Sequence, residues 1–107
     1  MLPNSNNDIS RNLKMIDFLK CELLNTIALL FETMIKGIKD RQELVAECLV
    51  NLLLATYTLG KRLGFDYETL DKKLQDKVKI SILEEHHLEK WYGDLSELNQ
   101  HISNHGK

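Results

Sequence analysis

Apolar side chains recur every three or four residues along the first third of the chain, which is the spacing of an amphipathic helix. This run starts at a cap formed by Asp8 or Ser10 and ends at Gly37. A second apolar face begins at Leu23, with Leu24, Ala28, Phe31 and Ile35. We therefore predict one helix, roughly 40 Å long, whose second half is buried on more than one side. Such a length favours a dimer.

Three further helices follow from the same kind of pattern. The second starts after Asp40 and ends at Gly64, which suits the position just past a helix. The third runs from a cap at Asp66 to a turn at Trp91, Tyr92 and Gly93, and the fourth from Leu95 to about Ile102. Trp91 and Tyr92 are expected to hold the third helix in place by hydrophobic packing or, alternatively, to stack a base at a subunit interface.

Glycine and proline are too scarce for a small β protein, which needs a turn every eight to twelve residues. The chain has 107 residues, one proline and five glycines, and neither type occurs between residues 9 and 36 or between 38 and 59. The predicted fold is all-α, an antiparallel bundle of two long core helices, a third long helix and a short C-terminal one. We expect a flexible arm over 1–8, a single domain over 9–103 and a polar tail over 104–107.

The charge, the apolar runs and the cysteines indicate which partners and which cellular compartment to expect. The formal net charge of −2 does not suggest nucleic-acid binding. No apolar run reaches about 18 residues, so no membrane span is expected, and the polar N-terminus does not resemble a signal peptide. Cys21 and Cys48 both sit in apolar helical patterns, which suggests buried, reduced thiols and a cytoplasmic protein.

The most informative residues are acids within apolar helices. Apolar neighbours surround Glu47, so we expect that its carboxylate cannot easily reach water. Glu43 and Asn51 lie one turn before and after it. Glu22 and Asn25 share one side of the first helix, so an antiparallel partner could bring them to Glu43 and Glu47. Carboxylates with amide neighbours suit Mg²⁺. The alternative is a polar core layer in which Glu47 pairs with a lysine or bonds Asn25.

The helix–loop–helix from Phe18 to Leu63 resembles the MazG-type nucleotide pyrophosphohydrolases. That family has Glu-Glu-x-x-Glu on its first helix and Glu-x-x-Asp on its second. Glu22 matches the second of these acids and Glu47 the last, while Cys21, Asn25 and Leu44 stand at the other three positions. The segment from His86 to Ser96 resembles the ending of a short subgroup called MazG-like proteins. The resemblance covers roughly residues 10–102.

The resemblance implies Mg²⁺-dependent cleavage of a nucleoside triphosphate to a monophosphate and pyrophosphate. The expected assembly is a homodimer or a dimer of dimers. For this activity we expect Glu22 and Glu47, which match family acids, to be catalytic, and Lys77 or Lys79 to take the part of a family lysine that contacts the nucleotide. From their placement on the helices we add Glu43 to Glu22 and Glu47 as a metal ligand, and Asn25 and Asn51 as further substrate contacts. The lysines alternatively form a solvated face. Because only two family acids are kept, the alternative function is a degenerate dimeric module that binds a nucleotide or a protein without turnover.

Overall fold

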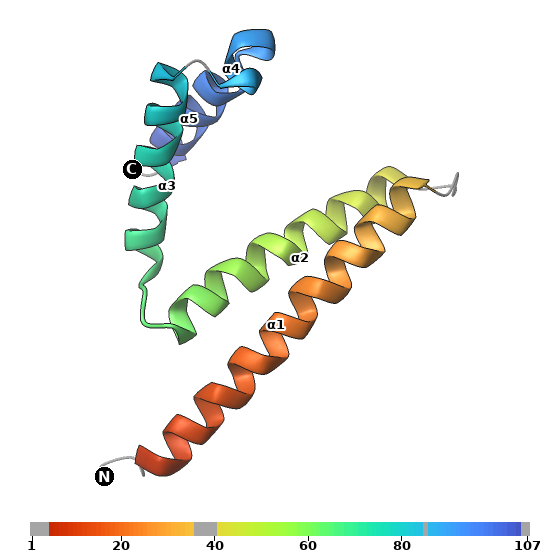
Figure 1. The fold of residues 1–107 in the computed structure, drawn as a ribbon, viewed down its shortest axis with the longest axis vertical. Coiled ribbons are helices and arrows are strands. Elements are labelled where there is room, and N and C mark those ends of the chain that lie inside the picture. Colours follow the sequence, from red (N-terminus) through yellow and green to blue (C-terminus); the bar gives the residue numbers. More distant parts are fainter. Residues whose placement is uncertain (1–4, 36–40, 85, 106–107) are drawn as a thin grey trace. The chain divides into compact units, whose positions relative to one another are not determined.

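The computed structural model describes residues 5–35, 41–84 and 86–105, and this part of the chain is helical with no strand. Its helices are α1 (Ser5–Ile35), α2 (Arg41–Arg62), α3 (Tyr67–Leu83), α4 (His87–Tyr92) and α5 (Asp94–His105) (Figure 1). The all-α prediction is confirmed. The chain divides into two compact units, one holding α1 and α2 and the other α3 to α5. The single domain over 9–103 stays a prediction.

The first unit is an antiparallel hairpin in which α1 and α2 lie side by side along their length (Figure 1). Its core is a narrow seam between the two helices, and the buried residues are Leu19, Leu30, Thr33, Cys48, Ala55 and Gly60. At the open end, the Asn12 side-chain amide donates a hydrogen bond of 3.0 Å to the carbonyl oxygen of Arg62. That bond fixes how far one helix is displaced along the other.

Gly64 ends α2 as predicted. Its φ is +102°, a conformation that costs glycine little and other residues more. The Gly64 amide donates to the Lys61 carbonyl at 3.1 Å, and the Phe65 amide donates to the Gly60 carbonyl at 2.9 Å. These two bonds form a Schellman motif, which satisfies carbonyls at the end of the helix.

The second apolar face of α1 is not buried in the single chain, contrary to the prediction. Phe31 and Ile35 are exposed, and so is Cys21, whereas Cys48 is buried as expected. The hairpin has only two helices, so each helix has one covered side. Apolar residues elsewhere on α1 and α2 therefore remain in contact with solvent.

The second unit departs from the predicted helix boundaries. The third helix ends at Leu83 and a separate short helix, α4, follows it. The His86 ring nitrogen Nδ1 accepts a hydrogen bond from the Leu88 amide and so starts α4. Trp91 and Tyr92 are 67% and 72% exposed, so they do not hold α3 by hydrophobic packing in this unit. The predicted turn is confirmed at Gly93 alone, which ends α4 with φ +69°.

One carboxylate joins α4 to α5. Glu89 accepts hydrogen bonds from the Ser96 hydroxyl and, at 2.9 Å, from the Ser96 amide. These hydrogen bonds hold the pKa of Glu89 below its ordinary value. The hydrogen bond from the Ser96 hydroxyl has the largest effect, and those from backbone amides have smaller ones. The junction between the two short helices therefore depends on an ionised carboxylate.

Both ends of the described chain are more helical than expected. Helix α1 already begins at Ser5, inside the predicted flexible arm, and α5 continues to His105, inside the predicted tail. The predicted cap at Asp40 and helix end at Gly37 lie outside the described residues. Among the described helices, only α2 is long and apolar enough to cross a membrane, and core helices of water-soluble bundles meet the same criterion.

Candidate functional site

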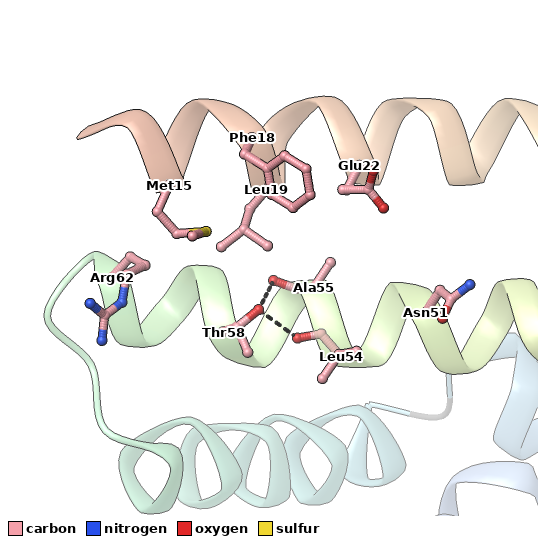
Figure 2. Close-up of a pocket in the computed structure, with 9 residues that line it drawn as sticks. All are labelled: Met15, Phe18, Leu19, Glu22, Asn51, Leu54, Ala55, Thr58 and Arg62. Carbon is pink, nitrogen blue, oxygen red and sulfur yellow. Dashed lines mark hydrogen bonds between the residues drawn. The ribbon is translucent and has the colours of Figure 1, made fainter. Parts of the chain in front are cut away.

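The hairpin holds an open pocket of about 370 Å³ between α1 and α2 (Figure 2). That volume lies within the range of small-molecule sites, about 300–1,000 Å³. Four residues of α1 and five of α2 line it: Met15, Phe18, Leu19, Glu22, Asn51, Leu54, Ala55, Thr58 and Arg62. The lining is apolar in the middle and polar at both ends.

Glu22 and Asn51 lie at one end of this pocket, and Arg62 lies at the other end with its guanidinium turned away from α1 (Figure 2). Asn51 and Arg62 are eleven residues apart on α2, which is about three turns, so they share a side and are separated by roughly 16 Å along the axis. A carboxylate and an amide at one end and a guanidinium at the other suit an elongated ligand with an anionic part.

Thr58, the remaining polar side chain of the pocket, is occupied by its own helix. Its hydroxyl donates to the Leu54 carbonyl at 2.8 Å and lies 3.3 Å from the Ala55 carbonyl (Figure 2). Such bonds to the preceding turn are common for threonine in helices. The groups of the pocket that remain for a ligand are therefore Glu22, Asn51 and Arg62.

Glu47 is exposed, so the expectation that it cannot reach water is wrong. Its apolar neighbours Leu44 and Val50 are exposed too, which is why they do not shield it. No hydrogen bond or ion pair joins Glu47 to another described residue, so the predicted polar core layer does not form there. Glu47 lies one turn before Asn51, roughly 6 Å along α2 and on the same side, and it extends the polar end of the pocket.

Asn25 is an exposed residue one turn after Glu22 on α1. A separation of three residues places the two on one side of the helix. Asn25 does not line the pocket itself, and it stands at its edge beyond Glu22. Of Glu22 and Asn25 and their predicted partners Glu43 and Glu47, only Glu22 lines the pocket, and it does so together with Asn51.

The predicted trio of metal ligands does not gather in the described chain. No group of three His, Cys, Asp or Glu side chains there is close enough to hold a metal ion. The register explains this, because Glu22 lies level with Asn51 and Glu43 comes eight residues, or roughly 12 Å, before Asn51. Glu43 is therefore too far along the hairpin to share a cation with Glu22.

Lys77 and Lys79 lie on α3, and both are exposed. They belong to the second compact unit, whereas the pocket belongs entirely to the first. A contact between these lysines and a bound phosphate stays a prediction, and so does their alternative role as a solvated face.

Sequence reasoning missed Arg62, Met15 and Phe18 as pocket residues. The spacing of eleven residues between Asn51 and Arg62 is a signal for a shared side of α2, but it has no meaning until the side facing the pocket is known. Met15 and Phe18 precede Glu22 by two turns and by one turn. They could not be recognised as site residues from the sequence, because they are apolar.

Mg²⁺ prefers oxygen ligands and is usually held by one or two carboxylates together with the phosphates of a substrate. The Glu22 carboxylate and the Asn51 amide oxygen are donors of this kind in one pocket. They fit Mg²⁺ that arrives with a phosphate ligand, and not a cage that would hold the ion alone.

A comparison with protein families finds one that covers most of the chain. The model of the MazG-like family matches residues 9–95, a range that includes most of α1, all of α2 to α4 and every residue of the pocket. The comparisons with curated proteins and with solved structures gave no match.

Proposed function

The chain belongs to the MazG-like family, and on that premise we propose that it is a nucleotide pyrophosphohydrolase whose substrate binds in the pocket between α1 and α2. The reaction adds water across the bond between the α and β phosphates of a nucleoside triphosphate and releases a monophosphate and pyrophosphate. The observation that carries the proposal is the pairing of Glu22 and Asn51 in one pocket with Arg62 at its far end.

The residues divide the work by their chemistry. Glu22, with Glu47 one turn from Asn51, would hold Mg²⁺ by carboxylate oxygens, and the bound ion would neutralise charge on the phosphates. The Asn51 amide can accept from water and donate to a phosphate oxygen, which orients the attacking water. Arg62 offers a guanidinium to an anionic oxygen. Met15, Phe18 and Leu54 offer apolar surface to the base and sugar.

The expected test is turnover of a panel of common and modified nucleoside triphosphates with Mg²⁺. The products, monophosphate and pyrophosphate, are separated by ion-exchange chromatography. Formation of both in equal amounts supports the proposal, and release of inorganic phosphate without pyrophosphate contradicts the bond assignment. Omission of Mg²⁺ is the control for the metal requirement.

A second function is favoured by one observation, the lack of a three-acid group in the described residues. In that case the protein binds a nucleotide without cleaving it, as a degenerate module. Thermal unfolding with increasing Mg²⁺–nucleotide would then show a rising midpoint, while the turnover assay shows no product. A flat midpoint and no turnover would favour a protein partner.

A further inference from the structure

We propose that the junction of α3, α4 and α5 is a pH-sensitive device, in which protonation of His86 removes the cap of α4 and releases the start of α5. His86 precedes α4, and its ring nitrogen Nδ1 accepts a hydrogen bond of 3.2 Å from the Leu88 amide. The His86 side chain is exposed to solvent, and an imidazole changes its charge between pH 5 and 8. This inference concerns the second compact unit and does not rest on the nucleotide chemistry.

His86 joins α3 to α4 through its backbone as well as its ring. Its amide donates to the Ser81 carbonyl on α3 at 3.0 Å, and its carbonyl accepts from the Glu89 and Lys90 amides, each at 2.9 Å. The ring bond to Leu88 satisfies a further amide in the first turn of α4. Helix α4 has only six residues, too few for a helix to persist without caps and tertiary contacts. The order of α4 therefore depends on His86.

Protonation reverses the effect of the His86 ring at this position. The neutral ring carries a proton on one nitrogen, so Nδ1 accepts a hydrogen bond when that proton is on Nε2. The imidazolium carries protons on both nitrogens and has no acceptor, so the Leu88 amide loses its partner. The cation also lies beside the amide groups at the start of the helix, where positive charge is unfavourable. The cap is therefore present when the ring is neutral and is lost as the pH falls through the imidazole range.

The first turn of α4 also carries the carboxylate that holds α5. Glu89 stands three residues after His86, at the position from which the side chain of a capping box reaches back to the cap. Here it reaches forward and accepts hydrogen bonds from the Ser96 hydroxyl and amide at the start of α5. A protonated His86 ring is a cation one turn from this carboxylate and competes with Ser96 for it. Loss of the cap and this competition both act to release Ser96.

No charged side chain holds the His86 ring in the described part of the second unit. There the ring accepts from the Leu88 amide and contacts the His87 ring edge-on, with 6.2 Å between the ring centroids. Glu85 lies outside the described residues. The bond to Leu88 is therefore the described interaction that a change of ring charge alters first. The charged groups nearest to His86 along the three helices are Lys79 on α3, Glu84 after it, Glu89 and Lys90 on α4, and Asp94 and Glu97 on α5.

The test is nuclear magnetic resonance of the isotope-labelled full-length protein between about pH 7.5 and 5.5, a window that covers the imidazole range. Glu89 stays ionised across it, because hydrogen bonds from Ser96 lower the pKa of Glu89. The Cα shifts of α4 measure its helix content. On acidification the ratio of helical to unfolded α4 should fall about fivefold, as for loss of one helix cap. The Ser96 amide proton should move upfield as it loses the carboxylate.

Three variants separate His86 from its neighbour. His86→Asn supplies a side-chain oxygen that caps a helix and does not titrate, so α4 should keep its helical shifts across the window. The matched control is His87→Asn, which removes the adjacent imidazole and should leave the wild-type transition unchanged. His86→Ala has no cap, so α4 should be weakened equally at both ends of the window, and this variant replaces His86→Asn if the latter fails to fold.

A wild type whose α4 shifts are the same at both ends of the window would overturn the inference. A transition that survives in His86→Asn, or that disappears in His87→Asn, would overturn it as well. A weakened α4 with an unchanged Ser96 amide would also count against it, because the release of α5 is part of the proposal.

Discussion

The Asn12 side-chain amide donates a hydrogen bond to the carbonyl oxygen of Arg62, fifty residues later in the chain, at 3.0 Å. This contact ties the open end of the α1–α2 hairpin and sets the register that brings Glu22 level with Asn51. It also leaves the Arg62 side chain free to line the pocket, because the bond uses only the Arg62 backbone.

Loss of this contact should destabilise the protein. A hydrogen bond contributes about 0.5–1.5 kcal/mol to stability, and Asn12→Ala removes the donor. Alanine also favours the helix by about half a kcal/mol relative to asparagine. The comparison is therefore Asn25→Ala, an exposed residue of the same helix, with about 1 kcal/mol between the two free energies of unfolding in urea. Equal values for both variants would show that the bond does not fix the register.

Arg62 is expected to contribute to nucleotide affinity. Removing its charge in Arg62→Gln keeps the backbone carbonyl that Asn12 uses, so the hairpin should remain folded. A charge-assisted hydrogen bond contributes about 1.5–3 kcal/mol, so the dissociation constant should rise by tenfold or more. Calorimetry with a Mg²⁺–nucleotide measures it, and Lys14→Gln, an exposed cation outside the pocket, controls for net charge. The same loss in both variants would argue against a specific contact.

A substitution at Gly93 should destabilise the protein through its backbone conformation and not through steric overlap. Its φ is +69°, and a Cβ there would meet no atom within 4 Å. Gly93→Ala should therefore cost about 1–2 kcal/mol from the left-handed conformation alone, whereas Gly93→Asn should cost less because asparagine tolerates that region. Thermal unfolding of the two variants measures the difference. An alanine variant as stable as the wild type would contradict the left-handed turn.

The Glu89 junction predicts a pH dependence. Hydrogen bonds from Ser96 lower the pKa of Glu89 in the folded state, so the folded protein binds a proton less readily than the unfolded chain. The stabilisation is present above the ordinary carboxyl pKa and is lost as the pH falls through the lowered one. Glu89→Gln should flatten the pH dependence of the unfolding midpoint in acid. Glu97→Gln, on α5, controls for the loss of one negative charge, and an equal flattening in both variants would contradict a specific role of the Glu89 junction.

The helical hairpin could be predicted from periodicity, because apolar residues recur every three or four positions along the core seam of α1 and α2. The end of α2 could also be predicted, since Gly64 takes a backbone conformation that other residues avoid. The break after Leu83 could not. It depends on the His86 ring acting as a helix cap, and histidine is not among the residues that usually signal one.

The candidate site was harder to predict than the fold. Glu47 has apolar neighbours in sequence, but neighbours shield a carboxylate only when another element covers them, and Leu44 and Val50 are exposed. Glu43 carries a suitable carboxylate but lies too far along the hairpin from Glu22. This could not be predicted, because the register of the two helices cannot be read from either helix alone. Glu22 and Asn51 were predicted as site residues from the sequence, but that they line one pocket could be seen only in the three-dimensional structure.

The central claim is that Glu22 and Asn51 act together on a nucleoside triphosphate, and the initial rate of pyrophosphate release tests it most directly. Glu22→Gln keeps the shape of the side chain and removes its charge, so kcat/KM should fall at least about 100-fold, or about 2.7 kcal/mol, and Asn51→Leu should also lower it. Glu32→Gln, the same change on α1 outside the pocket, should retain the wild-type rate. No pyrophosphate from the wild type, or equal rates for wild type and Glu22→Gln, would contradict the claim.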